Sequence, residues 1–341
     1  VSLSFEWYKT SSFDENTWVI SSKSDKNLLT RLEDKFVSLD EFTEGKSLRG
    51  VLTGLTNAFI IDQNTRDSIV AEDANSVKLI HPVLRGRDIK PFHGKLSGVY
   101  MICTFPSLNI DIDKYPGIKN HFLNFGKSKL EQSGQKGSRK KTSNKWFETQ
   151  DAIGYWKDFQ KPKIMYQKFQ VKPCFIYDDL GLYCNDSMWI IPTENRTLAG
   201  VLNSKMGWWL TTKYCTQIQN GCQLIWKYFG QVPIPKLNNE LDTLVADMIR
   251  LTKSLDTQLN GLLNLVKSKF TIEKFSNKLQ NWNELDFANF NKELKKQKVQ
   301  LSLAEEAEWL FYFEEEKKKA LELQRQINQT NQEIDQMVYE L

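Results

Sequence analysis

Apolar residues recur with two different spacings along this chain, and the spacing changes near residue 236. From about residue 46 to 236, short apolar, aromatic and β-branched runs alternate with clusters of glycine, proline and asparagine, which is typical of short strands. Beyond residue 236 the apolar residues step by three or four positions, which predicts long amphipathic helices. The pattern therefore predicts an α+β fold: a mixed, β-rich domain followed by a long-helix, antiparallel coiled-coil-like region.

The runs in the first region predict individual elements. We predict strands at 58–61, 99–105, 163–169, 174–177 and 188–191. Two helices interrupt them, one at about 118–130 and one at about 198–214 with Thr197 as its N-cap. Before this region, 18–20 predicts a short strand, and the spacing of apolar residues over 28–36 predicts a small helix that Asp25 could cap. We divide the chain into an N-terminal segment (1–45) packed on the β-rich domain, the β-rich domain itself (46–236) and a helical region (237–341).

The helical region has no proline after Pro235 and no glycine after Gly261. Its first helix is predicted by a near-heptad row of apolar residues at 241, 244, 248, 251, 255, 259, 262 and 266. Ser302 and Glu305 form a capping box that starts a second helix running to Leu341. The sequence leaves open whether the two helices pair as a hairpin that turns near 282–290, or pair between chains.

Charge is distributed unevenly along the chain, although the net charge is only +4. Between Lys78 and Lys172 there are 19 basic against 7 acidic residues, a net charge of +12. The remaining residues, 27 basic against 35 acidic, have a net charge of −8. A strongly basic middle of this kind indicates a polyanionic partner.

Seven basic residues lie close together within the basic middle: Lys127, Lys129, Lys136, Arg139, Lys140, Lys141 and Lys145. Serine, glycine and glutamine separate them, a composition that predicts a mobile loop rather than part of a core. Lysine and arginine neutralise DNA phosphates and release counterions, so these residues are candidate DNA contacts. The same residues also fit a plain solvated loop above an aromatic core.

Two further loops carry candidate residues. Arg85 and Arg87 flank Gly86 on a short turn, and guanidinium groups suit phosphates or guanine edges. The alternative there is a structural ion pair with Asp88. Thr53 and Asn57 belong to a glycine-containing cluster just before a predicted strand, where another backbone can approach closely, although a plain turn fits as well.

Complete enzyme motifs are absent from the sequence, so we assign no catalytic residue and no metal ligand to this chain. Gly45-Lys46-Ser47 lacks the earlier glycine of a phosphate loop, and no G-x-G-x-x-G or G-x-S-x-G occurs. Asp88-Ile89-Lys90 matches part of a metal-dependent nuclease motif, but such triplets are expected by chance several times in a chain of this composition. The five cysteines form no C-x-x-C pair, which predicts reduced, mostly buried thiols.

Several segments, in this order along nearly the whole chain, resemble the TaqI-like C-terminal specificity region of Type IIG restriction-modification enzymes. They are 50–62, 82–92, 146–151, 161–166, 202–205, 231–235 and 333–341. The resemblance implies a DNA target-recognition domain followed by helices. It also implies that a nuclease and an adenine-N6 methyltransferase precede this region in the same polypeptide, with S-adenosylmethionine and Mg²⁺ as their cofactors and none in this chain. The loop with Asn220 and Gln223 departs from relatives, which carry a second glycine at Cys222 and a nearby arginine, and we expect the recognised sequence to differ accordingly.

Our prediction is a non-catalytic, sequence-specific DNA-binding piece of a longer cytoplasmic restriction-modification enzyme; the chain begins at Val1 rather than at a methionine. Its expected partners are double-stranded DNA and the catalytic domains, with no membrane. Two alternatives remain at this stage: a nuclease that uses an acidic pair, and a protein-interaction module in which the helices bind a catalytic partner and the basic loop is incidental.

Overall fold

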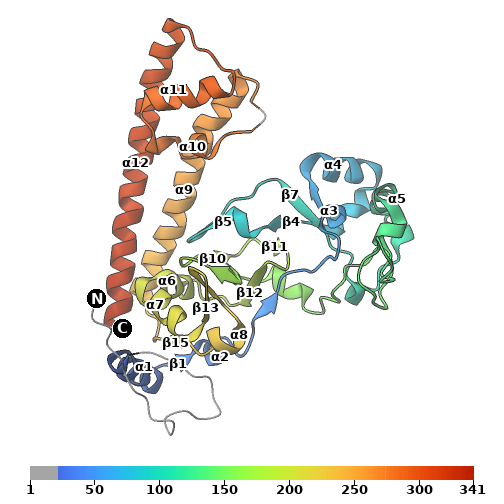
Figure 1. Cartoon of the computed structure of the whole chain (residues 1–341), viewed down its shortest axis with the longest axis horizontal. Coiled ribbons are helices and arrows are strands. Elements are labelled where there is room, and N and C mark those ends of the chain that lie inside the picture. Colours follow the sequence, from blue (N-terminus) through green and yellow to red (C-terminus); the bar gives the residue numbers. More distant parts are fainter. Residues whose placement is uncertain (1–21, 273) are drawn as a thin grey trace. The chain divides into compact units, whose positions relative to one another are not determined.

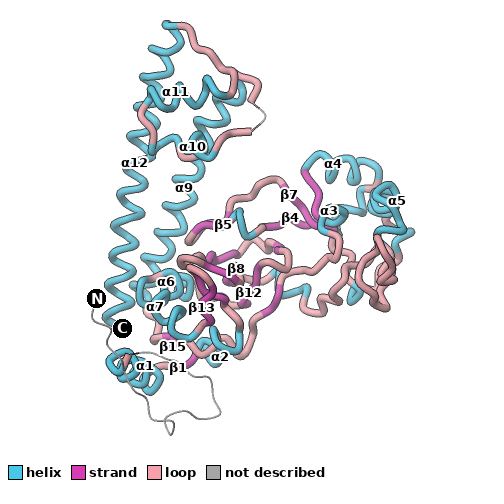
Figure 2. The backbone as a smooth tube through the Cα atoms, viewed as in Figure 1, coloured by secondary structure: helices cyan, strands magenta, loops and turns pink. Residues whose placement is uncertain are grey.

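The computed structural model describes residues 22–272 and 274–341. They form two compact units, of which the first ends at Asn238 and the second comprises Asn239–Glu340. Every described strand lies in the first unit, and the second unit is built from helices (Figures 1 and 2). The predicted α+β class is therefore confirmed. The predicted strand at 18–20 and most of the N-terminal segment lie outside the described residues.

Two four-stranded sheets form the middle of the first unit. The antiparallel sheet has the order β10-β8-β12-β2, with strands β2 (Leu48–Arg49), β8 (Lys163–Gln167), β10 (Phe175–Asp178) and β12 (Met188–Pro192). The mixed sheet has the order β11-β4-β7-β3, with strands β3 (Ile60–Asp62), β4 (Ile80–Leu84), β7 (Val99–Ile102) and β11 (Tyr183–Cys184). Within it β11 runs parallel to β4, and the other neighbours are antiparallel.

Three smaller sheets complete the first unit. They contain the pair β1 (Val37–Ser38) and β15 (Pro233–Ile234), the pair β5 (Ile89–Lys90) and β6 (His93–Gly94), and the antiparallel sheet of β13 (Thr216–Ile218), β14 (Gly221–Gln223) and β9 (Phe169–Gln170). The predicted strand at 163–169 is thus divided between β8 and β9. The strand predicted at 58–61 is wrong at its start, because Ala58 and Phe59 belong to a helical turn.

The helices of the first unit are α1 (Lys23–Lys35), α2 (Leu39–Phe42), α3 (Thr56–Phe59), α4 (Gln63–Glu72), α5 (Pro116–Leu130), α6 (Thr197–Asn203), α7 (Lys205–Tyr214) and α8 (Trp226–Phe229). Short 3₁₀ helices connect them: η2 (Ala74–Leu79), η3 (Gly86–Asp88), η4 (Pro106–Leu108), η5 (Ile112–Lys114) and η6 (Trp156–Gln160).

Two predicted helix caps are corrected by the structure. Ser22 rather than Asp25 caps α1, because its hydroxyl accepts the amide of Asp25, while the Asp25 carboxylate pairs with Lys213 at 2.7 Å. The single helix predicted at 198–214 is broken at Ser204, which has extended backbone angles and caps α7 by accepting the amide of Gly207. Thr197 is the first residue of α6 rather than its cap.

Strand β7 is shared by two hydrophobic cores, because successive side chains of a strand point to opposite faces. Met101 belongs to the core between the two four-stranded sheets, together with Met165 and Ile190. Ile102 belongs to the other core, with Phe59 of α3 and Phe122 of α5. The first unit therefore has three layers, a sheet on a sheet on helices, and α3 to α5 form one end of it in Figure 1.

A buried ion pair joins the first two strands of the antiparallel sheet. Lys163 and Asp178 face one another in the register of β8 and β10, and their side chains are 0% and 2% exposed. The ammonium of Lys163 also donates to the carbonyl of Phe159, and the carboxylate of Asp178 accepts the amides of Leu180 and Leu182. Lys163 belongs to the basic middle of the chain, but its charge is fully enclosed and cannot contact a partner.

The second unit is a hairpin of two long helices, α9 (Asn239–Lys269) and α12 (Leu303–Glu340), that lie side by side and run in opposite directions (Figure 1). Between them come α10 (Asn277–Gln280), η7 (Trp282–Glu284) and α11 (Phe287–Lys296). The two long helices thus pair within the chain, which is one of the two arrangements that the sequence leaves open. The capping box is confirmed, since Glu305 accepts the amide of Ser302 at 2.8 Å and Ser302 accepts that of Glu305.

The core of the second unit gathers where the short helices meet the long ones. Trp282 is fully buried, and its indole nitrogen donates to the carbonyl of Leu259 in α9 at 3.0 Å. Its ring packs on that of Phe313 from α12, with centroids 5.5 Å apart, and Phe290 of α11 packs on the same ring at 4.8 Å. These contacts fix the turn of the hairpin.

We predict that replacing Asp178 with Ala destabilises the first unit, because the substitution leaves the ammonium of Lys163 buried without its counter-charge. The expected loss is about 3–5 kcal/mol in the free energy of unfolding, measured by urea denaturation. The control is Asp158→Ala, which removes the exposed pair with Lys161 and is expected to cost less than about 1 kcal/mol. Equal effects of the two substitutions would contradict the prediction.

Candidate nucleic-acid interface

The predicted lysine cluster begins at the last turn of α5. Gly126 has φ +116°, a conformation that favours glycine, and the helix is kinked at this residue. The kinked turn carries Lys127 and Lys129, whose side chains are exposed. The ammonium of Lys127 lies 5.5 Å from the centre of the Trp146 ring, and that of Lys129 lies 5.7 Å from the Phe125 ring. Both ammonium groups thus lie over aromatic faces, which attract the positive charge without neutralising it.

Arg139 differs from its prediction as a DNA contact, because its side chain is buried beneath the segment that follows α5. Its guanidinium donates to the carbonyls of Leu130 (2.9 Å), Thr53 (2.8 Å) and Trp146 (2.8 Å), which belong to three separate segments. It also lies over the Phe59 ring, 5.2 Å from its centre. Burial lowers the pKa of Arg139 to about 10, so it remains charged at neutral pH.

Gln132 supports the same segment from a second buried position. Its amide nitrogen donates to the carbonyls of Lys145 (3.2 Å) and Glu148 (3.1 Å), and its amide oxygen accepts the hydroxyl of Thr142. The segment contains no helix or strand, as its composition predicts. The expectation that it carries no core is wrong for Gln132 and Arg139, which replace the missing backbone ladder with side-chain hydrogen bonds.

The other lysines of the segment project into solvent. Lys136, Lys140, Lys141 and Lys145 are all exposed. Lys145 lies 3.7 Å from the carboxylate of Glu148, a contact with an exposed ammonium that contributes little. Within the part of the chain that the structure describes, the remaining cluster lysines (127, 129, 136, 140 and 141) have no carboxylate within ion-pair distance. We call these five residues the lysine surface.

Of the two arginines in the turn at Gly86, Arg85 is bound, whereas Arg87 has no hydrogen-bond or ion-pair partner among the residues that the structure describes. Arg85 makes a two-pronged contact with Asp88, at 2.7 and 3.0 Å, and donates to Ser97 at 2.6 Å. The predicted alternative, a structural ion pair between Arg85 and Asp88, is therefore observed. The Asp88 carboxylate, which a nuclease would need as a metal ligand, is occupied by this contact. Arg87 is exposed. A Cβ at Gly86 would lie 2.1 Å from the side-chain nitrogen of Gln167, so any larger residue here would displace that side chain.

Thr53 and Asn57 sit beside the lysine segment but in different environments. Thr53 is 3% exposed, and its carbonyl is one of the three acceptors of Arg139. Its predicted role as a DNA contact is therefore corrected, since the side chain is enclosed. Asn57 is exposed on α3 and remains accessible.

Asn220 and Gln223 belong to the β13–β14 hairpin, on the sheet that β9 completes. Asn220 is exposed at the turn, whereas Gln223 is half-buried and pairs with both Thr216 and Phe169. Gln219 precedes Asn220 with φ +56° and is also exposed. The sequence analysis did not identify Gln219 as a candidate contact. The adjoining Asn220-Gly221 pair, typical of a hairpin turn, could have indicated that Gln219 is exposed at the turn.

The candidate residues therefore fall into two groups within the first unit. The lysine surface, Asn57 and the buried Arg139 belong to the end formed by α3 and α5, with the core around Phe122. Arg85, Arg87 and the β13–β14 hairpin belong to the antiparallel-sheet end, where β9 continues from β8. The accessible groups differ in kind: the first group offers five ammonium groups and the amide of Asn57, and the second offers the amides of the hairpin and the exposed guanidinium of Arg87.

The cysteines are buried free thiols, as the sequence predicts. Burial raises the pKa of Cys174 to about 11 and that of Cys184 to about 12, which keeps both thiols protonated and unreactive at neutral pH. Among the described residues, no three His, Cys, Asp or Glu side chains are grouped as metal ligands. None of the described helices combines the length and apolar composition that a membrane span requires.

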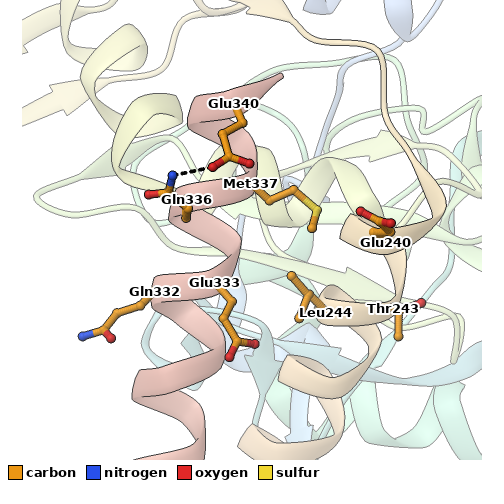
Figure 3. Close-up of a pocket in the computed structure, with 8 residues that line it drawn as sticks. All are labelled: Glu240, Thr243, Leu244, Gln332, Glu333, Gln336, Met337 and Glu340. Atoms are coloured by element: carbon orange, nitrogen blue, oxygen red, sulfur yellow. Dashed lines mark hydrogen bonds between the residues drawn. The ribbon is translucent and has the colours of Figure 1, made fainter.

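A pocket of about 710 Å³ lies between α9 and α12 in the second unit. Leu244 and Met337 point toward one another across it, and Glu240, Glu333 and Glu340 stand around it (Figure 3). Gln336 donates to Glu340 at 2.5 Å beside the opening. Three carboxylates make this pocket unsuited to a phosphate group, so it is not a candidate contact with nucleic acid.

Two family models match the chain. Residues 81–234 match the TaqI-like C-terminal specificity domain. The resemblance inferred from the sequence is thereby confirmed over this stretch, which includes the lysine surface, both arginines of the Gly86 turn and the β13–β14 hairpin. Residues 235–338 match a domain of unknown function (DUF8810).

A curated relative is the Type II methyltransferase M.BstVI of Geobacillus stearothermophilus. It is 23% identical over an alignment of 282 residues, and the match covers 79% of this chain and 47% of that protein. The chain thus spans about half the length of the relative it matches.

Two solved structures resemble the chain more distantly. The Type IIL restriction-modification enzyme MmeI in complex with DNA aligns with 81% of this chain and 36% of its own, with a TM-score of 0.41 and 11% identity. The type IIG restriction endonuclease BpuSI aligns with 93% of this chain and 33% of its own, with a TM-score of 0.41 and 13% identity.

We predict that Arg139→Met destabilises the first unit and releases the lysine segment, because two buried carbonyls and one partly buried carbonyl lose their donor together. The expected loss is at least about 3 kcal/mol in the free energy of unfolding, at 1–3 kcal/mol for each unsatisfied group. Trypsin should then cleave within 136–145 faster than in the unaltered chain. The exposed Lys140→Met serves as control and should change stability by less than about 0.5 kcal/mol; unchanged stability and cleavage in the Arg139 variant would refute the role assigned to this residue.

Proposed function

We propose that the first unit binds double-stranded DNA and recognises a specific sequence. The observation that carries this proposal is the lysine surface on a scaffold fixed by Arg139 and Gln132. Its five exposed ammonium groups have no carboxylate partner in the described ranges 22–272 and 274–341. Unpaired lysines on a rigid support neutralise phosphates at little cost in conformational entropy. The match to a specificity domain over the same residues supports the assignment.

In this proposal the two groups of residues have separate tasks. The lysine surface holds the phosphate backbone and fixes the position of the duplex, which contributes affinity without sequence information. The hairpin amides of Gln219 and Asn220, with the free guanidinium of Arg87, read base edges, since an amide side chain suits adenine and a guanidinium suits guanine. Chemistry is not assigned to this chain.

We further propose that the chain is part of a longer restriction-modification enzyme whose remaining residues carry the methyltransferase and nuclease activities. The support is the match to about half of a Type II methyltransferase. S-adenosylmethionine and Mg²⁺ would then be bound by those other domains. An adenine must leave the base stack to be methylated, and a bound specificity domain holds the duplex while this happens.

Reversing charge on the lysine surface tests the phosphate contacts. Lys136, Lys140 and Lys141 replaced together with Glu should weaken binding to a duplex and flatten the dependence of log K on log salt concentration by about 2–3, at about 0.9 for each phosphate that is no longer neutralised. The measurement is a fluorescence anisotropy titration at several salt concentrations.

The matched control carries the same change of net charge in the second unit, with the exposed Lys253, Lys267 and Lys292 replaced by Glu. This control should retain the original salt dependence. If both triple variants lose affinity to the same extent, binding depends only on net charge, and the lysine surface is not the interface.

The hairpin is tested by sequence preference rather than affinity. Asn220→Ala should relax the preference at one base position by about 1–3 kcal/mol and leave the salt dependence unaltered, because an amide contact reads a base edge without neutralising a phosphate. The measurement is selection of bound sequences from random duplexes, with the exposed Asn64→Ala on α4 as control. An unchanged preference for every base in the Asn220 variant would remove the hairpin from the reading surface.

A further inference from the structure

The first turns of α12 expose large apolar side chains to solvent. Leu303, Leu310, Phe311 and Tyr312 are 86%, 43%, 74% and 37% exposed. Leu303, Leu310 and Phe311 lie on one face of the helix, since positions i, i+7 and i+8 belong to the same stripe of an α-helix. We call these four residues, together with Trp309, the tip surface.

A groove continues the tip surface toward the end of α9. Trp309 and Tyr312 line it from α12, and Leu265 and Phe270 line it from the α9 side, around a volume of about 350 Å³. The Phe270 and Trp309 rings lie 6.0 Å apart, and Tyr312 meets the Trp309 ring edge-on at 6.2 Å. An aromatic groove beside an exposed apolar stripe gives a partner both a pocket and a flat contact area.

The exposed stripe is not needed for folding of the hairpin. The core of the second unit uses another face of the same turns, where Phe313 is fully buried and Glu306 accepts a hydrogen bond from Asn291 at 2.6 Å. A helix with one buried face normally carries polar side chains on the face exposed to solvent. Contiguous apolar side chains on the solvent face are instead typical of a surface that another molecule covers.

Negative charge frames this stripe. Six glutamates and no basic residue occur between Val299 and Glu316. Glu308, Glu314 and Glu315 flank the aromatic residues, and none of these three has an ion-pair contact among the described residues. Lys319, in the next turn, interacts electrostatically with Glu315, so Glu308 and Glu314 are the less compensated carboxylates. Lys269, at the far side of the groove, is the single basic residue that lines it.

This charge decides among the possible occupants. Phosphate-rich partners such as nucleic acids or anionic lipid surfaces are repelled by unpaired carboxylates. A symmetric dimer would bring the same carboxylates of two copies together across its axis. A positively charged, amphipathic protein segment satisfies both the apolar stripe and the carboxylates around it.

We propose that the tip surface is a docking site for a cationic amphipathic helix of a partner protein. The apolar face of that helix lies on Phe311 and in the groove beside Trp309, and its lysines or arginines face Glu308, Glu314 and Glu315. This interaction is independent of DNA binding by the first unit.

The experiment uses the full chain and a fluorescently labelled synthetic peptide of about five helical turns, made of leucine and lysine with leucine at helical spacing. A second peptide replaces every lysine with glutamate. Fluorescence anisotropy should show binding of the lysine peptide and none of the glutamate peptide. Equal binding of both peptides, or binding of neither, would overturn the proposal.

Two variants address the apolar and the charged parts separately. Leu310→Ser with Phe311→Ser should weaken binding of the lysine peptide at least about tenfold, and so should Glu308→Gln with Glu314→Gln and Glu315→Gln. All five positions are exposed, so both variants are expected to fold. The charge variant removes no apolar side chain and so tests the proposal even if the serine variant unfolds.

Matched controls lie at the other end of the same hairpin. Tyr339→Ser removes an aromatic ring that is 72% exposed, and Glu240→Gln with Glu333→Gln and Glu340→Gln neutralises the pocket of Figure 3. Both should bind the lysine peptide as the unaltered chain does, and a loss in either would place the peptide elsewhere and overturn the proposal.

A concentration-dependent dimer that Phe311→Ser dissociates would identify a self-association surface instead. Duplex binding that falls in the tip variants would identify a nucleic-acid surface, which also contradicts the proposal, whereas absence of duplex binding in the unaltered chain bears only on the proposed function.

Discussion

A buried peptide carbonyl needs a donor, and the segment between α5 and Trp146 has no neighbouring strand to supply one. Arg139 meets this requirement for three carbonyls at once, which is why a charged side chain can be stable in the interior. Its fork of donors connects the end of α5, the loop at Thr53 and the chain at Trp146. The lysines around it can remain exposed because a different basic residue maintains the backbone beneath them.

The sequence predicts elements well where one periodicity governs them. Strands β8, β10 and β12, the long helices α9 and α12, and the capping box at Ser302 follow from apolar spacing and local cap chemistry. The sequence predicts elements poorly where the observed backbone conformation differs from the helix or strand propensity of the local residues. The break at Ser204 and the helical turn at Ala58-Phe59 depend on tertiary packing, which overrides the local pattern.

For the candidate site, composition locates the basic region but does not separate structural from accessible charges. Arg139 and Lys163 look like their neighbours in the sequence, yet each is enclosed by partners that are distant in the fold. Arg85 is the exception, because its partner Asp88 is three residues away and the ion pair could be anticipated. A basic residue can be proposed as a DNA contact only once the structure shows that acceptors of the same chain do not already bind its charged group.

The sharing of β7 between two cores has a consequence for attempts to redesign this molecule. Because Met101 and Ile102 anchor opposite faces of one strand, the helical end and the antiparallel-sheet end cannot be separated by a cut in the chain without opening both interiors. If the lysine-bearing end alone were grafted onto another scaffold, one face of β7 would lose the core that it packs against in this protein. The transplantable module is the whole three-layer body, whereas the hairpin turn at Gln219 and Asn220 can be exchanged within it.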